Sequence, residues 1–197
     1  AWSLSAAAGT TLSSRHADAF FNAPYVTQDA ASTTNGDVIS LYTNRYFAYI
    51  GDPVSFVAEW EAGMNNTTNK TVQFGLRDGA GFGNGGIWFE KTNGGGWLCN
   101  AGGTSINSGF SAPGEGSVDR FKLEVIGKSI PVGGSAQRTA RFFINDTLVA
   151  EINSNQVGAG PFLFSVVTKA LANNQVIYTA MGPLQATWAR LLSAPAL

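Results

Sequence analysis

The stretch from Gly75 to Gly103, GLRDGAGFGNGGIWFEKTNGGGWLCNAGG, holds the residues of this sequence that are best suited to bind a ligand. Trp88 and Trp97 offer flat aromatic faces on which a sugar ring can stack. Nearby polar side chains can form hydrogen bonds at the rim of such a site, and they are Arg77, Asp78, Asn84 and Asn100. We predict a ligand-binding site at these residues. The alternative is that one or both tryptophans fill the protein core.

The glycines of this stretch do not match a phosphate-binding loop. The stretch lacks Gly-Lys-Ser/Thr, and no strand leads through Gly-x-Gly-x-x-Gly into a helix. The glycines are instead predicted to serve as turn and close-approach positions in two loops that flank a strand hairpin.

Two carboxylates raise the question of glycoside hydrolysis. Glu59 and Glu61 are two residues apart in a predicted strand, so they share one face. Hydrolysis needs two carboxyl groups at a suitable separation across a sugar bond. A solvated strand face is the interpretation that we favour, and we predict no catalytic residue.

Metal and nucleophile chemistry have little support in the sequence. Cys99 is the only cysteine and is predicted to be a small buried apolar residue. His16 is the only histidine, which disfavours His-rich or thiolate metal sites and a Ser-His-Asp arrangement. Asp78 with Asn84 is the least implausible calcium pair, but no acidic cluster accompanies it. We predict no metal and no cofactor.

Composition limits the classes of partner. Only 13% of the 197 residues are charged, and 12 basic residues face 13 acidic ones without a cluster of either sign. Nucleic acid and anionic membranes attract proteins through concentrated positive charge, so neither is a predicted partner. No segment resembles a transmembrane span, and the first fourteen residues lack the basic and apolar regions of an intact signal peptide.

Alternation of apolar and polar residues indicates the fold class. It is clearest in residues 53–63, 70–78 and 119–127, where one face is apolar and the other polar. Further strands are predicted within 37–43, 86–92, 96–101, 138–145, 147–153, 161–170, 176–181 and 184–192. Asn145-Asp146 suits a tight hairpin, and only residues 13–23 suggest a turn or two of helix. The sequence therefore predicts an all-β, antiparallel two-sheet β-sandwich of jelly-roll type, with about ten or more strands.

The order of these segments resembles a known family. FVAEWEAG, VQFGLRDG, GIWFEKTNGGGWLCNAGG, DRFKLEVIG, ARFFINDTLVAEI and PFLFSVVTK follow one another as in the concanavalin A-like lectin/glucanase domains. The laminin-G-like versions in bacteriophage capsid-surface and tail proteins are especially similar. The resemblance spans residues 37–190 and implies a sheet face or loop rim open to glycans or protein partners. It departs from the glucanases at Trp60, where they carry an Asp between two Glu residues, and the His, Tyr, Arg and Gln set of the related lyases cannot be placed.

The predicted organisation is an N-terminal arm with a first strand or short helix (1–36), the sandwich (37–190) and a C-terminal tail (191–197). Both ends are poor in charge, which suggests burial against other copies or proteins. The resemblance implies a non-enzymatic virion-surface protein, either a capsid decoration protein or a receptor-binding module. It would be a homo-oligomer whose partners are virion proteins and cell-surface glycans. The alternatives are a secreted extracellular lectin and a degenerate glycoside hydrolase or lyase.

Overall fold

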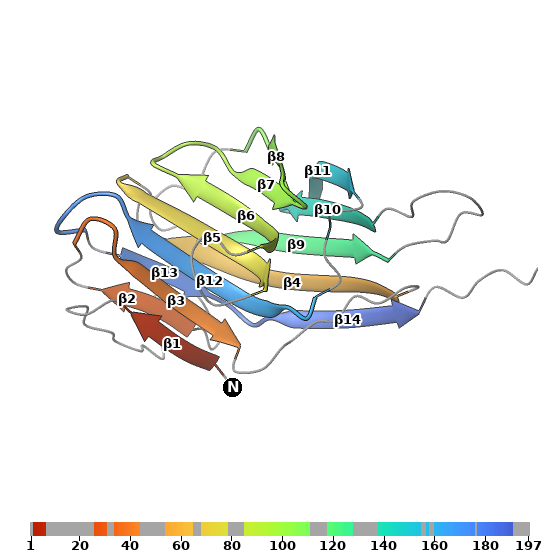
Figure 1. Ribbon diagram of the computed structural model, residues 1–197, viewed down its shortest axis with the longest axis horizontal. Coiled ribbons are helices and arrows are strands. Elements are labelled where there is room, and N and C mark those ends of the chain that lie inside the picture. The colour runs from red at the N-terminus through yellow and green to blue at the C-terminus, as the bar shows by residue number, and fades with distance from the viewer. Residues whose placement is uncertain are drawn as a thin grey trace, which may run out of the picture.

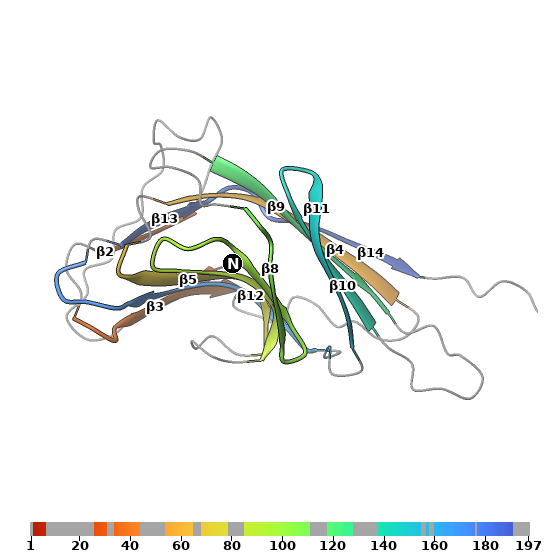
Figure 2. The same ribbon diagram turned by 90° about the horizontal axis from the view of Figure 1, so that it is seen from above.

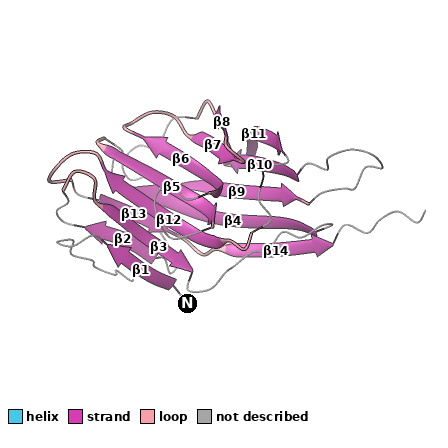
Figure 3. Cartoon of the chain, viewed as in Figure 1, coloured by secondary structure: helices cyan, strands magenta, loops and turns pink. Residues whose placement is uncertain are grey.

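The computed structural model describes the chain as strands and loops. It covers residues 2–6, 26–30, 34–43, 54–64, 68–78, 85–110, 118–127, 138–154, 157, 160–175 and 177–190. These residues form fourteen strands and no helix (Figure 3). The first seven are β1 (Trp2–Ala6), β2 (Val26–Ala30), β3 (Val38–Thr43), β4 (Val54–Met64), β5 (Lys70–Arg77), β6 (Gly86–Thr92) and β7 (Leu98–Ala101). The others are β8 (Thr104–Asn107), β9 (Val118–Ile126), β10 (Arg138–Ile144), β11 (Thr147–Ser154), β12 (Leu163–Ala170), β13 (Ile177–Met181) and β14 (Gln185–Arg190).

The strands form two antiparallel sheets that pack face to face (Figures 1 and 2). The front sheet has the order β1-β3-β12-β5-β6-β7-β8. The back sheet has the order β11-β10-β9-β4-β13-β2, and β14 also pairs with β4. Residues from distant parts of the chain are therefore neighbours within each sheet. The predicted all-β, two-sheet sandwich is confirmed.

Period-two alternation explains which residues face the core. In β4, Phe56, Ala58 and Trp60 are buried, and they stand opposite the buried Val125, Leu123 and Phe121 of β9. Each neighbour in these strands points the other way and is exposed or half-buried. In β5 the predicted inward residues Val72, Phe74 and Leu76 are also buried. Removing one apolar face from water on each sheet is the main driving force for this arrangement.

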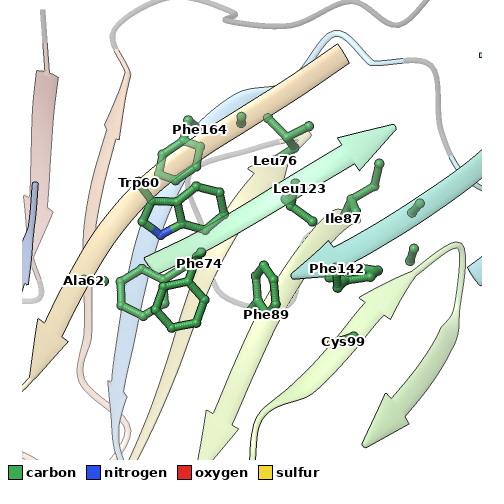
Figure 4. Packing of buried hydrophobic residues seen from close by; sticks show 14 of the residues in the cluster. Trp60, Ala62, Phe74, Leu76, Ile87, Phe89, Cys99, Leu123, Phe142 and Phe164 are labelled. Atoms are coloured by element: carbon green, nitrogen blue, oxygen red, sulfur yellow. The ribbon is translucent and has the colours of Figure 1, made fainter. Parts of the chain in front are cut away.

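Aromatic rings fill the space between the sheets (Figure 4). Trp60 of the back sheet packs against Phe164 of the front sheet with ring centroids 4.8 Å apart, and Phe121 packs against Phe89 at 5.1 Å. Such edge-to-face pairs add about 0.5–1.5 kcal/mol each beyond their buried area. The aromatic cluster thus fixes the two sheets relative to each other and gives their outer faces a rigid support.

Two local predictions have different outcomes. The hairpin at Asn145-Asp146 is confirmed, because both residues have positive φ (50° and 64°) and link β10 to β11. The helical turn proposed for residues 13–23 and the tail at 191–197 lie outside the described residues. Strands β1 and β2 fall inside the predicted N-terminal arm, and they pair with β3 and β13 of the sandwich.

The described part of the chain contains no helix that is long and apolar enough to cross a bilayer.

Candidate functional site

The outer face of the front sheet gathers polar side chains from four strands. Residues paired across antiparallel strands point to the same face, so the register defines rows that run across the sheet. One row joins β3, β12, β5, β6, β7 and β8, and it consists of Tyr42, Ser165, Gly75, Trp88, Asn100 and Ser105. A neighbouring row places Gln73 of β5 opposite Glu90 of β6. We call Gln73, Arg77, Trp88, Glu90, Asn100 and Ser165 the outer-face cluster.

Two glycines allow β5 and β6 to approach each other beneath this cluster. A Cβ on Gly75 would lie 2.4 Å from the carbonyl oxygen of Ile87, and a Cβ on Gly86 would lie 2.0 Å from that of Leu76. Both glycines also have positive φ, 149° and 142°, which residues other than glycine rarely adopt. The predicted close-approach role is therefore confirmed at these two positions.

Hydrogen bonds connect the cluster across β5 and β6. Arg77 Nη1 donates to Gln73 Oε1 at 2.6 Å, and Gln73 Nε2 donates to Glu90 Oε2 at 2.7 Å. Trp88 Nε1 donates to the same Glu90 oxygen at 3.3 Å. These bonds fix the orientation of the Trp88 ring and hold the Glu90 carboxylate in place.

Arg77 is the cation of the network. Its guanidinium carbon lies 4.3 Å from the centroid of the Trp88 ring, which is a cation–π arrangement. Burial lowers the pKa of the Arg77 guanidinium to about 10, and the charges of Asp78 and Glu90 oppose that shift. Arg77 therefore stays cationic at neutral pH, and one face of Trp88 is already covered.

Besides Nε of Arg77, whose guanidinium is otherwise engaged, two polar atoms of the cluster have no hydrogen-bond partner among the described residues. They are Asn100 Nδ2 on β7 and Ser165 Oγ on β12, and both atoms are buried. Buried polar groups in proteins are nearly always hydrogen-bonded, because an unmet group costs about 1–3 kcal/mol. They are candidates for hydrogen bonds to a ligand.

Burial within the cluster is graded. Gln73, Arg77 and Ser165 are at most 2% exposed, although they point away from the core. Trp88, Glu90 and Asn100 are half-buried. The buried groups form a polar floor, and the half-buried groups form the part that a ligand can contact. A flat ring beside fixed donors and acceptors suits a ligand that has both an apolar face and hydroxyl groups.

Comparison with known proteins identifies structures that share this fold. No family model and no curated protein matches the sequence. Among solved structures, the carbohydrate recognition domain of Emp47p gives a TM-score of 0.56 at 11% identity, over 94% of this chain and 87% of that one. Alginate lyase AlyC3 in complex with dimannuronate gives 0.52 at 8% identity, over 86% and 76%. A sialidase gives 0.56 at 7% identity, over 94% of this chain and 17% of that one.

The fold is that of the concanavalin A-like lectins and glucanases. The predicted resemblance is confirmed at this level. At such low identity the similarity concerns the fold, and the bacteriophage context stays a prediction.

The concanavalin A-like sandwich brings together three of the predicted site residues. Arg77, Trp88 and Asn100 share the outer face of the front sheet. Arg77 was expected at a rim, but it is 0% exposed and belongs to the floor. Asp78 is exposed just beyond β5, where its backbone nitrogen donates to the Gly85 carbonyl, and Asn84 lies outside the described residues.

The structure corrects the prediction that Trp97 belongs to the ligand-binding site. Trp97 is 0% exposed and packs against Phe74, Phe89 and Phe121, with centroid distances of 5.7, 6.5 and 5.0 Å. The core therefore surrounds its ring, and Trp97 offers no face to a ligand. Of the two tryptophans, Trp88 belongs to the candidate site and Trp97 to the scaffold.

Three members of the cluster were missed from the sequence. Gln73 and Glu90 alternate with inward residues, so a signal for their outward direction was present in the strand pattern. Ser165 lies in β12, which is buried on both faces, and its sequence shows no clear alternation. It is placed beside Gly75 only by the pairing of β12 with β5.

Other candidate chemistry lies elsewhere. Cys99 is buried as predicted, and burial raises the pKa of its thiol to about 12, so it is not a reactive thiolate. Glu59 and Glu61 are on the outer face of the back sheet, where Arg120 lies 3.9 Å from Glu59. No group of three or more potential metal-binding His, Cys, Asp or Glu side chains occurs among the described residues, and His16 is outside them.

Proposed function

We propose that this protein is a non-catalytic carbohydrate-binding domain and that the outer-face cluster is its binding site. The observation that carries the proposal concerns two buried polar atoms, Asn100 Nδ2 and Ser165 Oγ, which have no hydrogen-bond partner among the described residues and lie in the same cross-strand row as the half-buried Trp88.

A sugar is complementary to this arrangement. The C–H groups on one face of a pyranose can stack on the Trp88 ring, on the side opposite Arg77. Its hydroxyls can accept from Asn100 Nδ2 and can donate to Glu90, whose Oε2 is already fixed by Gln73 and Trp88. Because the network is held before binding, little conformational entropy is lost when the ligand docks.

Solved structures with this fold are consistent with the proposal. One is described as a carbohydrate recognition domain and another as an alginate lyase in complex with dimannuronate. Binding and catalysis therefore both occur on this fold, and the site residues have to distinguish between them.

The site residues favour binding without hydrolysis. Glu90 is the only acidic residue among the described strand positions of the front sheet's outer face. Glycoside hydrolysis uses two carboxyl groups, one as acid and one as base or nucleophile. With one carboxylate among these described positions, we infer that the domain binds its glycan and does not hydrolyse it.

The biological setting is a separate part of the proposal. A place on a virion surface, as a capsid decoration or receptor-binding homo-oligomer, stays the expectation from the resemblance and from the charge-poor ends. A secreted monomeric lectin is the alternative. Size-exclusion chromatography with light scattering distinguishes them: a trimer or other closed oligomer agrees with the first, and a monomer with the second.

The binding site is tested by a glycan array followed by calorimetry on the hits. Trp88→Ala and Asn100→Ala should each weaken binding by about tenfold or more, equivalent to ~1.4 kcal/mol, with little change in melting temperature. The matched control is Thr139→Ala on the back sheet's outer face, which should bind as the wild type does. Loss of binding in the control but not in the first two variants would place the site on the other sheet.

Catalysis is tested on the same protein. Incubation with the bound polysaccharide should release no shorter products. Turnover that Glu90→Gln abolishes would show that the domain is an enzyme.

A further inference from the structure

We propose that the outer-face cluster selects uncharged sugars over uronic or sialic acids. This inference rests on the proposed function and names its ligand class. Its basis is the distribution of charge among the described strand positions of the front sheet's outer face, where Arg77, the cation beside Trp88, is already engaged.

The charges on this face are few. The charged residues among its described strand positions are Arg77, Glu90 and Lys169. Arg77 donates to Gln73, lies over Trp88 and interacts with the charges of Asp78 and Glu90. Lys169 is opposite Thr71 at the other end of β12 and also has an interaction partner. A carboxylate on the ligand would have to replace an existing interaction to gain a cation.

Glu90 would also repel such a ligand. Glu90 is half-buried beside Trp88, and hydrogen bonds from Gln73 and Trp88 hold its carboxylate in place. A second carboxylate stacked on Trp88 would share this partly desolvated space with Glu90. Like charges at short range in a low dielectric are unfavourable, and Arg77, the cation beside Trp88, already interacts with the charge of Glu90.

A neutral sugar gains from the same groups. Glu90 Oε1 has no hydrogen-bond partner among the described residues, whereas Oε2 accepts two bonds. A hydroxyl donates to a carboxylate in a charge-assisted bond, and a hydroxyl oxygen can accept from Asn100 Nδ2. The carboxylate that excludes acidic sugars is therefore an acceptor for neutral ones.

The test compares sugars that differ only at one carbon. Three matched pairs of oligosaccharides are suitable, based on glucose and glucuronate, mannose and mannuronate, and galactose and galacturonate, with identical linkage and length within each pair. In whichever pair binds, calorimetry should find the neutral member bound about tenfold more tightly or better, a difference of ~1.4 kcal/mol.

Glu90→Gln tests the cause. Glutamine keeps the size of the side chain and one oxygen that can accept from Gln73 and Trp88, but it removes the charge. Binding of the acidic member should strengthen and the ratio within the pair should fall towards one, with Thr139→Ala as the unchanged control. If Glu90→Gln does not fold, the wild type in increasing salt is the second measurement. Screening should strengthen binding of the acidic member and leave the neutral one unchanged.

The outcomes separate the two proposals. Tighter binding of the acidic member, or a ratio that neither Glu90→Gln nor salt alters, would overturn the selectivity but keep the binding site. Failure of every pair and of the glycan array would overturn the proposed function itself, and this inference with it.

Discussion

The two outer faces of the sandwich satisfy their polar groups in different ways. On the back sheet, charged residues are paired with each other and are in partial contact with solvent. Arg141 Nε lies 2.7 Å from Glu151, and Lys122 Nζ lies 3.0 Å from Glu124. On the front sheet, charge is sparse, the polar side chains are mostly buried, and Asn100 and Ser165 each have a polar atom with no hydrogen-bond partner among the described residues.

This difference indicates which face binds a ligand. Exposed ion pairs contribute little and lose little when separated, because water replaces each partner. Buried polar groups are costly unless they are hydrogen-bonded, so a ligand that supplies the missing bonds gains free energy there. Under the proposed function, a ligand would supply the hydrogen bonds that the described residues of the front face lack, whereas the described ion pairs of the back face need no ligand.

The back sheet does have a hollow, and its lining supports the same conclusion. An open groove of about 300 Å³ forms where β4 changes partner from β14 to β13, and it is lined by Glu59, Trp60, Glu61, Arg120, Pro183 and Gln185. Arg120 lies 3.9 Å from Glu59 and 3.2 Å from Asp146. Glu59 and Arg120 of this lining are thus already paired with each other, and concavity alone does not make this face the binding site.

The strongest disturbance of the front face should come from Gly75→Ala. The added methyl would meet the backbone of Ile87 and Trp88, at 2.4 and 2.8 Å, and φ is positive. We expect the free energy of unfolding to fall by roughly 3 kcal/mol or more, and glycan binding to weaken because Trp88 moves.

Gly94→Ala is the matched control in the same glycine-rich stretch. Its φ is also positive, at 77°, but nothing lies within 4 Å of the added methyl. Chemical denaturation should show a loss of only about 1 kcal/mol and calorimetry no loss of binding. Equal losses in the two variants would mean that backbone conformation, and not close approach, is what Gly75 provides.

A smaller but selective effect is expected from Gln73→Ala. This change removes an acceptor from the buried Arg77 and a donor from Glu90. Unfolding by urea should show a loss of about 2 kcal/mol, as for other buried hydrogen bonds to charged groups. On the back face, Asn153→Ala also removes two side-chain hydrogen bonds, to Thr139 and Glu151, but at an exposed position. It should change stability by less than about 0.5 kcal/mol, and a comparable loss there would contradict the distinction between the faces.

The fold was predictable from the sequence because the alternation is local. The apolar residues Phe56, Ala58 and Trp60 recur at every second position, and this spacing alone predicts a half-buried strand. The same reasoning could have placed Trp97, which is two residues from Cys99 and therefore points with it into the core. The prediction of about ten or more strands agrees with the fourteen that the described residues form, although short edge strands such as β8 carry no apolar alternation and were not among the predicted segments.

The site was less predictable because it depends on register between strands. Nothing near Gln73 in the sequence indicates that its amide meets Glu90, or that Ser165 lies beside Gly75. These contacts follow from pairings of β5 with β6 and β12, and a shift by one residue would turn each side chain to the other face. Sequence patterning thus gives the direction of a side chain, and the sheet order gives its neighbours.

The smallest predicted effect concerns the exposed pair on the back sheet. The hydrogen bond from Arg141 lowers the pKa of the Glu151 carboxyl below its ordinary value, and a bond from Asn153 acts in the same direction. A lowered pKa in the folded state means that the pair stabilises the protein above the ordinary carboxyl pKa and that this contribution disappears as the pH falls through the folded-state value. Glu151→Gln should therefore lower the melting temperature slightly at neutral pH and not at all at acid pH. High salt should reduce even the neutral-pH difference, because both side chains are more than a third exposed. Glycan affinity should be the same in the variant and the wild type under all these conditions. A loss of stability that persists in high salt, or a loss of binding, would contradict the view that the ion pairs of the back face are weak, solvent-exposed and independent of the binding site.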